Sequence, residues 1–158
     1  MPKHDLDEAD FRILQNLQEN ARLTNVELAE RIGLSPSPCL RRLKRLEEDR
    51  IISGYMTLVD QNAVGLPVSV FVNITLKEQS EPALKKFETR IRQLPQVMEC
   101  YLMTGTSDYL LRIVTADLAA YERFLKDHLT RITVIASIQS SFALKQVTFR
   151  TALPLTAT

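Results

Sequence analysis

Two short helices separated by only three residues are the feature that most constrains this chain. The first begins at Thr24, which forms a capping box with Glu27. Gly33 ends it, because glycine readily takes the left-handed conformation of a helix C-terminus. Ser35 is then the N-cap of the next helix, and Pro36 takes its first position, where a missing N–H costs nothing. The pattern predicts two helices joined by a tight turn.

The second of these helices has one apolar side and one basic side. Pro38 falls in its first turn without an N–H, so we expect the Ser35 hydroxyl to cap only the N–H of Ser37. The apolar stripe consists of Cys39, Leu40, Leu43 and Leu46. The cations off that stripe are Arg41, Arg42, Lys44 and Arg45. Taken alone, this pattern also fits an ordinary solvated surface helix.

An earlier helix completes a three-helix unit. Asp7 is its predicted N-cap, with Leu6 and Phe11 placed for a hydrophobic staple, and its apolar face runs to about Asn20. Three such helices with a Gly-containing turn are typical of a helix-turn-helix, whose second helix enters the major groove of DNA. The residues that we expect at DNA bases or phosphates are Ser35, Ser37, Pro38, Arg41, Arg42, Lys44 and Arg45.

The charge of this part argues for assembly. Residues 1–54 hold nine Lys and Arg against ten Asp and Glu, a net charge of −1. Nucleic-acid-binding domains often carry a basic excess. A single copy should therefore bind DNA weakly, and several half-sites should be engaged at once by a dimer or larger assembly.

The rest of the composition excludes several classes of protein. The 158 residues suffice for two small domains, and no stretch of 18 apolar residues predicts a membrane span. The N-terminus has no apolar secretion signal. Cys39 and Cys100 lie in apolar patterns and are expected to be reduced and buried, as in a cytoplasmic protein. No CxxC, P-loop or G-x-S-x-G occurs, so we expect no metal, no cofactor and no catalytic residue.

The second half of the chain predicts a different fold. Residues 55–59 are a possible hinge strand, followed by a turn or linker. Further strands are expected over 68–76, 97–104, 109–115 and 135–149. Ser80 can cap one helix, with Leu84, Phe87, Ile91 and Leu94 inward. Asp117 is the predicted cap of another, with Leu118, Tyr121, Phe124 and Leu125 inward. The order β-α-β-β-α-β predicts a ferredoxin-like sheet with both helices on one face. The predicted domains are 1–54, a hinge at 55–66, and 67–158.

The uncovered sheet face and one turn are the candidate functional regions of this second domain. The face should present Phe71 and either Tyr101 or Cys100, depending on register, which is too apolar for a free surface and predicts sheet-to-sheet dimers. The turn 104–108 is either a plain hairpin or a ligand site. In the second interpretation, Asp108 supplies a free carboxylate for an α-ammonium, while Thr106, Ser107 and backbone N–H groups receive an α-carboxylate. Gln139, Ser140 and Ser141 on the last strand are plausible neighbours.

The chain resembles the Lrp/AsnC, or feast/famine, family of transcriptional regulators. The resemblance is carried by the segments 6–22, 24–47, 98–112 and 140–147. It implies an α+β protein with a winged helix-turn-helix and a ferredoxin-like effector domain, assembling from homodimers to octamers. By motif, the implied effector-binding residues are Gly105, Thr106, Ser107, Asp108, Tyr109, Ser140 and Ser141. The stretch 132–135 departs from the family, which often has Pro-Gly there, so a wider turn or an earlier strand is expected.

The resemblance also implies partners and a cellular role. Double-stranded DNA and an amino-acid effector, leucine or another apolar one, are the expected partners of a cytoplasmic, nucleoid-associated regulator. The similarity is nearest to the branch that governs amino-acid catabolism, including branched-chain keto-acid degradation. Two alternatives remain: an architectural protein that wraps DNA without an effector, and a small enzyme on a ferredoxin-like sheet. Against the enzyme, Asp108 has no partner base or nucleophile in the sequence.

Overall fold

The computed structural model describes residues 5–156 as two compact units. The first unit runs to Leu58 and also takes in the tail from Val147, whereas the second comprises Val59–Gln146. Within the described residues, no helix has the length and apolar character that crossing a bilayer requires. The domain limits expected from the sequence remain a prediction; by packing, the C-terminal tail belongs with the helical unit.

Three helices form the first unit: α1 (Glu8–Glu19), α2 (Asn25–Ile32) and α3 (Pro36–Glu48). The predicted caps of α1 and α2 are confirmed. Asp7 accepts from the N–H of Asp10, Thr24 accepts from the N–H of Glu27, and both helices have complete capping boxes. Gly33 is left-handed at φ 71° and ends α2. The core of this unit consists of Ile13, Leu17, Leu28, Ala29, Ile32, Cys39 and Leu46.

Two expectations about α3 were wrong. Ser35 stands at the N-cap, but its hydroxyl makes no capping hydrogen bond. Pro36 and Pro38 remove two of the amide donors of the first turn, so little is left to cap, and the exposed Ser35 and Ser37 face solvent. Leu40 does not belong to the buried stripe; it is exposed, because the inward face of α3 is centred on Cys39 and Leu46.

The tail packs back on α1, which sequence reasoning did not anticipate. The side chain of Gln18 donates to the carbonyl of Leu153 at 3.2 Å and accepts from its N–H at 2.7 Å. Gln15 donates to the carbonyl of Leu155 at 3.1 Å. The amide side chains of α1 therefore replace a strand partner for the extended backbone of the tail.

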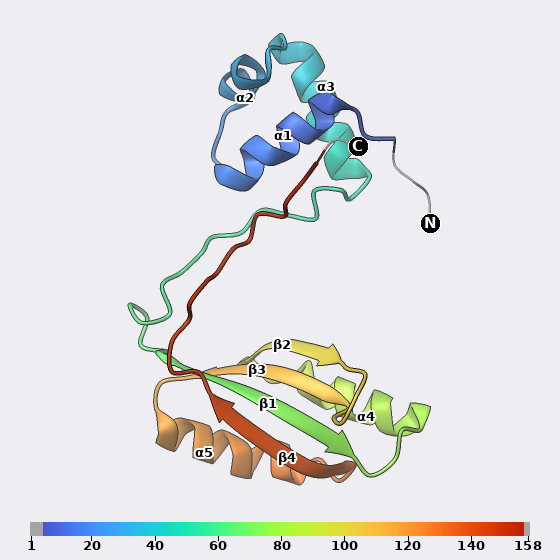
Figure 1. Cartoon of the computed structure of the whole chain (residues 1–158), viewed down its shortest axis with the longest axis vertical. Coiled ribbons are helices and arrows are strands. Elements are labelled where there is room, and N and C mark those ends of the chain that lie inside the picture. Colours follow the sequence, from blue (N-terminus) through green and yellow to red (C-terminus); the bar gives the residue numbers. More distant parts are fainter. Residues whose placement is uncertain (1–4, 157–158) are drawn as a thin grey trace. The chain divides into compact units, whose positions relative to one another are not determined.

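The second unit is a four-stranded antiparallel sheet in the order β2-β3-β1-β4. Its strands are β1 (Val68–Leu76), β2 (Val97–Leu102), β3 (Tyr109–Thr115) and β4 (Ile135–Phe142). The helices α4 (Glu81–Ile91) and α5 (Leu118–Asp127) cover one face, and a 3-10 turn, η1 (Leu129–Arg131), follows α5. Figure 1 shows both helices on one side of the sheet and no helix on the other. The predicted ferredoxin-like topology is confirmed.

Alternation along the strands decides which side chains reach the core. Val70, Val72 and Ile74 of β1 are fully buried against the helices, as are Leu111 and Ile113 of β3. Phe87 and Ile91 of α4 and Tyr121 and Phe124 of α5 complete this core. Leu118 was expected to point inward but is exposed, because it is the first residue of α5 and lies off the stripe of Tyr121 and Phe124.

The strand limits differ from the sequence expectation in two places. Residues 55–59 form no strand, because a strand needs a hydrogen-bonded neighbour and this segment finds none among residues 5–156. The hydroxyl of Tyr55 instead donates to Glu47 at 2.8 Å, and burial together with this bond raises the pKa of Tyr55 to about 12. β4 ends at Phe142 rather than at residue 149, since β1 offers no partner beyond Val68.

Residues 132–135, where the sequence lacks the Pro-Gly pair frequent in the resembled family, form a tight turn before β4. The N–H of Ile135 donates to the carbonyl of Ile132 at 3.1 Å, which closes a tight turn without glycine. The strand begins at Ile135, so the turn is not wider and the strand does not begin earlier. The register then shifts, since Leu76 pairs with Ile135 and Thr75 with Ser137. Ala136 is the extra residue of a β-bulge that absorbs the irregularity.

Candidate nucleic-acid interface and ligand site

The outward face of α3 presents a short row of polar and basic side chains. Ser37, Arg41 and Lys44 follow one another at spacings of four and three, so they share one face of the helix. All three are exposed, and no ion pair holds Arg41 or Lys44 within residues 5–156. This face, together with Ser35 at the helix start and the half-buried Pro38, is available to a DNA duplex.

Arg42 and Arg45 have different surroundings from the other two cations. Arg42 donates to Asp7 at 2.7 Å and to Asp10 at 3.0 Å, and Arg45 donates to the second oxygen of Asp10. The Asp10 side chain is fully buried. The expectation that Arg42 and Arg45 lie at DNA bases or phosphates is therefore not supported by their positions, because both guanidinium groups point back to α1.

The ion pairs shift the protonation of their members. The pKa of Asp7 is lowered, chiefly because its carboxylate accepts the backbone N–H of Asp10. Burial opposes this shift, and the hydrogen bond and charge of Arg42 lower the pKa further. The pKa of Arg42 is raised, first by its hydrogen bond to Asp7 and then by that to Asp10. We call the four residues Asp7, Asp10, Arg42 and Arg45 the α1–α3 clamp, because their ion pairs fasten α3 to α1.

The turn between α2 and α3 is fixed by a further contact that sequence reasoning missed. The side-chain amide of Asn25, at the start of α2, donates to the carbonyl of Pro36 at 2.8 Å. The N–H of Leu34 donates to the carbonyl of Ala29 at 2.9 Å and closes the end of α2. The first turn of α3 is therefore fixed to the start of α2 by Asn25. This contact sets the direction in which Ser37 and Arg41 project.

The turn 104–108 in the second unit places its groups differently from the sequence expectation. Gly105 has a φ of 122°, which L side chains rarely adopt, so the glycine is required by the backbone. Thr106 is exposed and Ser107 half-buried, but Asp108 is only 6% exposed. The expected free carboxylate is wrong: Asp108 accepts from the N–H of Leu76 and from the side chain of Gln79, both at 2.6 Å.

Asp108 differs from Asp10 in having no cation. Among residues 5–156 no Lys, Arg or His forms an ion pair with it, and both of its donors are neutral amides. A buried charge without a counter-charge is costly. The burial of Asp108 without a cation therefore makes it a candidate binding group.

Successive side chains of β4 point to opposite faces of the sheet. Gln139 pairs with Asn73 of β1, whose side chain accepts from the hydroxyl of Ser107 at 3.2 Å, so Gln139 lies on the same face and close to the turn. Ser141 shares this face beside Phe71. Ser140 points to the helices instead and hydrogen-bonds to the hydroxyl of Tyr121. The strand register thus separates Ser140 from the other predicted ligand residues.

Tyr109, the remaining candidate, is part of the core. It is 1% exposed, its ring lies 4.4 Å from that of Phe87, and its hydroxyl donates to Glu88 at 3.0 Å. Burial, followed by this carboxylate, raises its pKa well above the usual value. Tyr109 therefore anchors the strand that follows the turn and presents no group to a ligand on the open face.

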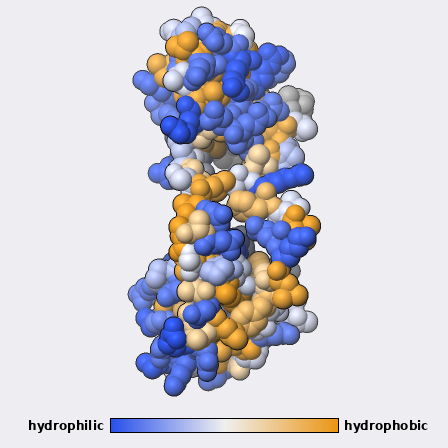
Figure 2. Space-filling model, turned by 90° about the vertical axis from the view of Figure 1, so that its left-hand side faces the viewer, coloured by the Kyte–Doolittle hydropathy of each residue, from blue (hydrophilic) through white to orange (hydrophobic). Residues whose placement is uncertain are grey.

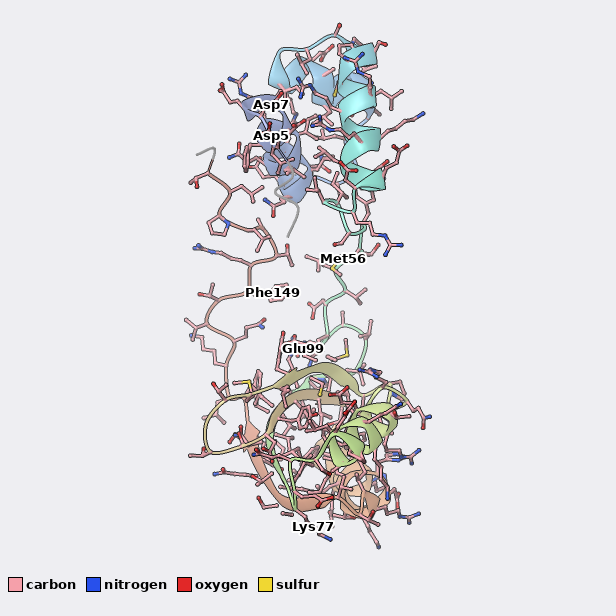
Figure 3. All side chains as sticks on the ribbon, turned by 90° about the vertical axis from the view of Figure 1, so that its right-hand side faces the viewer. Asp5, Asp7, Met56, Lys77, Glu99 and Phe149 are labelled. Atoms are coloured by element: carbon pink, nitrogen blue, oxygen red, sulfur yellow. The ribbon has the colours of Figure 1, made fainter. Side chains whose placement is uncertain are left out.

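The open sheet face carries an ordered polar network among exposed apolar side chains. Phe71 and Tyr101 are exposed there, which resolves the register in favour of Tyr101 over Cys100. Arg112 donates to Glu99 at 3.3 Å and to Gln61 of the linker at 3.1 Å. Figure 3 shows Glu99 on the side of the sheet away from Lys77, which follows the end of β1. Sequence reasoning missed this network because its members lie far apart in the chain.

Two depressions lie elsewhere on the second unit. One, of about 280 Å³, lies between α4 and residues 131–133, and the other, of about 190 Å³, lies beside Cys100 and Tyr109. Neither includes residues 104–108. No group of three or more metal-ligating side chains occurs in the described part of the chain. Cys39 is buried as expected, whereas Cys100 is exposed, contrary to expectation, because it lies on the edge strand β2.

This fold and these sites define a transcriptional regulator with a DNA-binding and a ligand-binding domain. Residues 6–53 match the model of the winged helix-turn-helix DNA-binding family, and residues 69–153 match that of the Lrp/AsnC ligand binding domain. The chain belongs to the Lrp/AsnC family of regulators, which are not enzymes.

Individual relatives agree along nearly the whole length. The chain is 47% identical to the Bkd operon transcriptional regulator of Pseudomonas aeruginosa, covering 96% of this chain and 99% of that one. It is 37% identical to the leucine-responsive regulatory protein of Escherichia coli K12, covering 92% and 89%. A crystal structure of a Neisseria meningitidis transcriptional regulator in complex with L-Met superposes with a TM-score of 0.90 at 43% identity, covering 94% and 96%.

Proposed function

We propose that this chain regulates genes of amino-acid metabolism by binding specific DNA sites, and that a free amino acid bound near Asp108 changes this activity. The observation that carries the proposal is the Asp108 carboxylate, which is buried and has no cation among residues 5–156. The preceding residue, Ser107, contacts Asn73 on the open sheet face. An α-ammonium is the complementary charge. The regulator of known structure that was solved with L-Met supports an apolar amino acid such as leucine or methionine.

The DNA-binding surface in this proposal is the outward face of α3. Ser37 and Arg41 lie near the N-terminal end of that helix, where a recognition helix reaches base edges, and Lys44 follows one turn later toward the phosphate backbone. Arg42 and Arg45 act indirectly, by holding the helix. With two of its four cations committed to the α1–α3 clamp, one copy has few charges left for phosphate contacts, so binding requires several copies.

Assembly follows from apolar surface that a single copy leaves uncovered. Phe71 and Tyr101 are exposed on the sheet face without helices. Met56 and Phe149 are exposed on extended segments, as Figure 3 shows. Figure 2 shows apolar residues along these segments as well. Patches of this kind mark protein interfaces. We therefore propose a homodimer that assembles further, with an octamer as the expected form and the effector bound where dimers meet.

The limits of the functional parts belong to the same proposal. Residues 1–54 would bind DNA, 55–66 would act as the hinge, and 67–158 would bind the effector and oligomerise. The similarity to a Bkd operon regulator supports amino-acid catabolism as the controlled process, on the nucleoid in the cytoplasm. An effector can shift DNA binding only if it binds one arrangement better than another, by about 1–3 kcal/mol for a typical allosteric coupling.

The test is calorimetry of the full chain against each common amino acid, followed by sizing and DNA binding with and without those that bind. We expect saturable binding of an apolar amino acid, an assembly larger than a monomer at micromolar concentration, and a change in size or DNA affinity on binding. If no amino acid binds while DNA binding persists, the chain is an architectural DNA-wrapping protein. A monomer at micromolar concentration contradicts the proposed assembly.

A further inference from the structure

Gln79 is an exposed residue whose side chain contacts the buried carboxylate of Asp108. Its side-chain nitrogen donates to one carboxylate oxygen at 2.6 Å, while the other oxygen is held by the buried backbone N–H of Leu76. Gln79 itself is exposed, although the carboxylate beneath it is only 6% exposed. The glutamine therefore covers the carboxylate oxygen that a ligand can reach from solvent.

Gln79 lies in an exposed link between β1 and α4. Lys77, Glu78 and Gln79 are exposed and link the end of β1 to Ser80, the first position before α4. The hydroxyl of Ser80 does not cap α4 but donates to Glu78 at 3.0 Å. The bond to Asp108 is the one that fixes the Gln79 side chain among the described residues, so exchanging that bond releases it.

The chemistry favours a cation over the amide at this position. A neutral amide donor satisfies one lone pair of the carboxylate but leaves its charge uncompensated. An ammonium group makes a charge-assisted hydrogen bond that is roughly twice as strong as a neutral one. We propose that Gln79 occupies, in the ligand-free chain, the place of the effector's α-ammonium group, and that the amino acid displaces it from Asp108. This inference rests on the proposed function and names the residue that sets effector affinity.

Two substitutions at this position have opposite expected effects. Gln79→Ala removes the competing donor, so the ligand-free carboxylate loses its cover and the amino acid binds about fivefold more tightly, the scale of one net hydrogen bond. Gln79→Lys supplies a permanent ammonium within reach of Asp108. The effector must then displace a cation, and its affinity falls by about tenfold or more.

The experiment is calorimetric titration of the wild-type full chain, Gln79→Ala and Gln79→Lys with the amino acid that the wild type binds best. Gln93→Ala is the matched control, because Gln93 is an exposed glutamine of the same unit that contacts Arg90 and not Asp108. We expect it to bind as the wild type does. Circular dichroism on each variant establishes that the fold is kept, and both substitutions lie at an exposed loop position.

The outcomes separate this inference from the function on which it rests. Tighter binding by Gln79→Ala together with weaker binding by Gln79→Lys supports the exchange. Unchanged affinity in both, or weaker binding by Gln79→Ala, overturns it and leaves the amino-acid site in place. If neither the wild type nor Gln79→Ala binds any of the common amino acids, the proposed effector function fails, and the exchange fails with it.

Discussion

Asp10 and Asp108 are the two buried carboxylates in the described part of the chain, and their surroundings are opposite. Asp10, in the helical unit, is fully buried and is met by the guanidinium groups of Arg42 and Arg45. Asp108, in the sheet unit, is nearly as buried and is met only by the amides of Leu76 and Gln79. The negative charge of Asp10 is thus balanced by cations, whereas that of Asp108 is not.

The difference agrees with a structural role for Asp10 and with the binding role that we propose for Asp108. A carboxylate with two cations has its electrostatic need met inside the fold, so Asp10 fixes the position of α3 and has nothing left for a ligand. A carboxylate held by neutral donors keeps an attraction for a cation from outside. In a regulator of this kind, the charge of its partners therefore indicates whether a buried carboxylate stabilises the fold or is a candidate for ligand binding.

The largest effect is expected from Asp10→Ala. Removing a partner from a buried ion pair costs about 3 kcal/mol here, the lower end of the usual range, because Arg42 and Arg45 still reach solvent. Hydrogen exchange should accelerate at the amides of α1 and α3 and remain unchanged in β1 and β3. Asp127→Ala, which removes an exposed pair with Arg131, is the control and should change stability by about 1 kcal/mol or less. If hydrogen exchange at α1 and α3 is the same in both variants, the α1–α3 clamp does not stabilise the helical unit.

Asp108→Asn should affect binding and not stability. The amide is isosteric but carries no charge, so the amino acid loses a charged partner and its affinity falls about 10–100-fold. Thermal unfolding of the sheet unit should change little, because an uncompensated charge is removed along with one acceptor. Calorimetry and a melting curve on the same preparation measure both. If the amino-acid response survives, the turn is only a hairpin.

The two adjacent arginines of α3 offer a sharper test within one helix. Arg41→Ala should weaken DNA binding by about 1–3 kcal/mol if it meets a base, or lower the salt slope by about one if it meets a phosphate. Arg42→Ala should act mainly through the α1–α3 clamp, lowering the stability of the helical unit. Fluorescence anisotropy with labelled DNA across a salt series separates the two. A loss of the same kind in both variants contradicts their assigned roles.

The smallest effect is expected from pH. The folded pKa of Asp7 lies below its ordinary value of 3.8, so its contribution is complete above that pH and is lost as the pH falls through the folded value. The denaturation midpoint of the wild type should therefore fall more steeply below about pH 4 than that of Asp7→Asn. Circular dichroism in urea at a series of pH values measures the two slopes. Parallel slopes mean that ionisation of Asp7 contributes nothing to the stability of the folded chain.

Much of the fold was predictable because its signals are local. The caps at Asp7, Thr24 and Asp117 and the stop at Gly33 depend on residues within one helical turn. The limits of β1 followed from alternation along residues 68–76. The misjudged elements depended on neighbours instead: residues 55–59 lack a strand partner, and β4 ends where β1 no longer runs beside it.

The sequence indicated which residues to consider as site residues, but not which groups surround them in the folded chain. The sequence placed Gly105 and Asp108 in one turn, but it gave no sign that the side-chain donor to Asp108 is Gln79, 29 residues away. Arg42 was grouped with Arg41 because both are cations of one helix. Its partner Asp10 lies 32 residues away, on another helix. Ser140 and Ser141 are adjacent in sequence but lie on opposite faces of the sheet.

By itself, the amino-acid sequence determined the helices, most strands, the order β-α-β-β-α-β and the turn that carries Asp108, because each depends on backbone preferences and periodicity over a few residues. Only the tertiary structure decided which cations remain free for DNA and which carboxylate remains without a counter-charge. Those properties depend on contacts between segments about 30 residues apart, and the energy of a charge is set by the groups that folding brings around it.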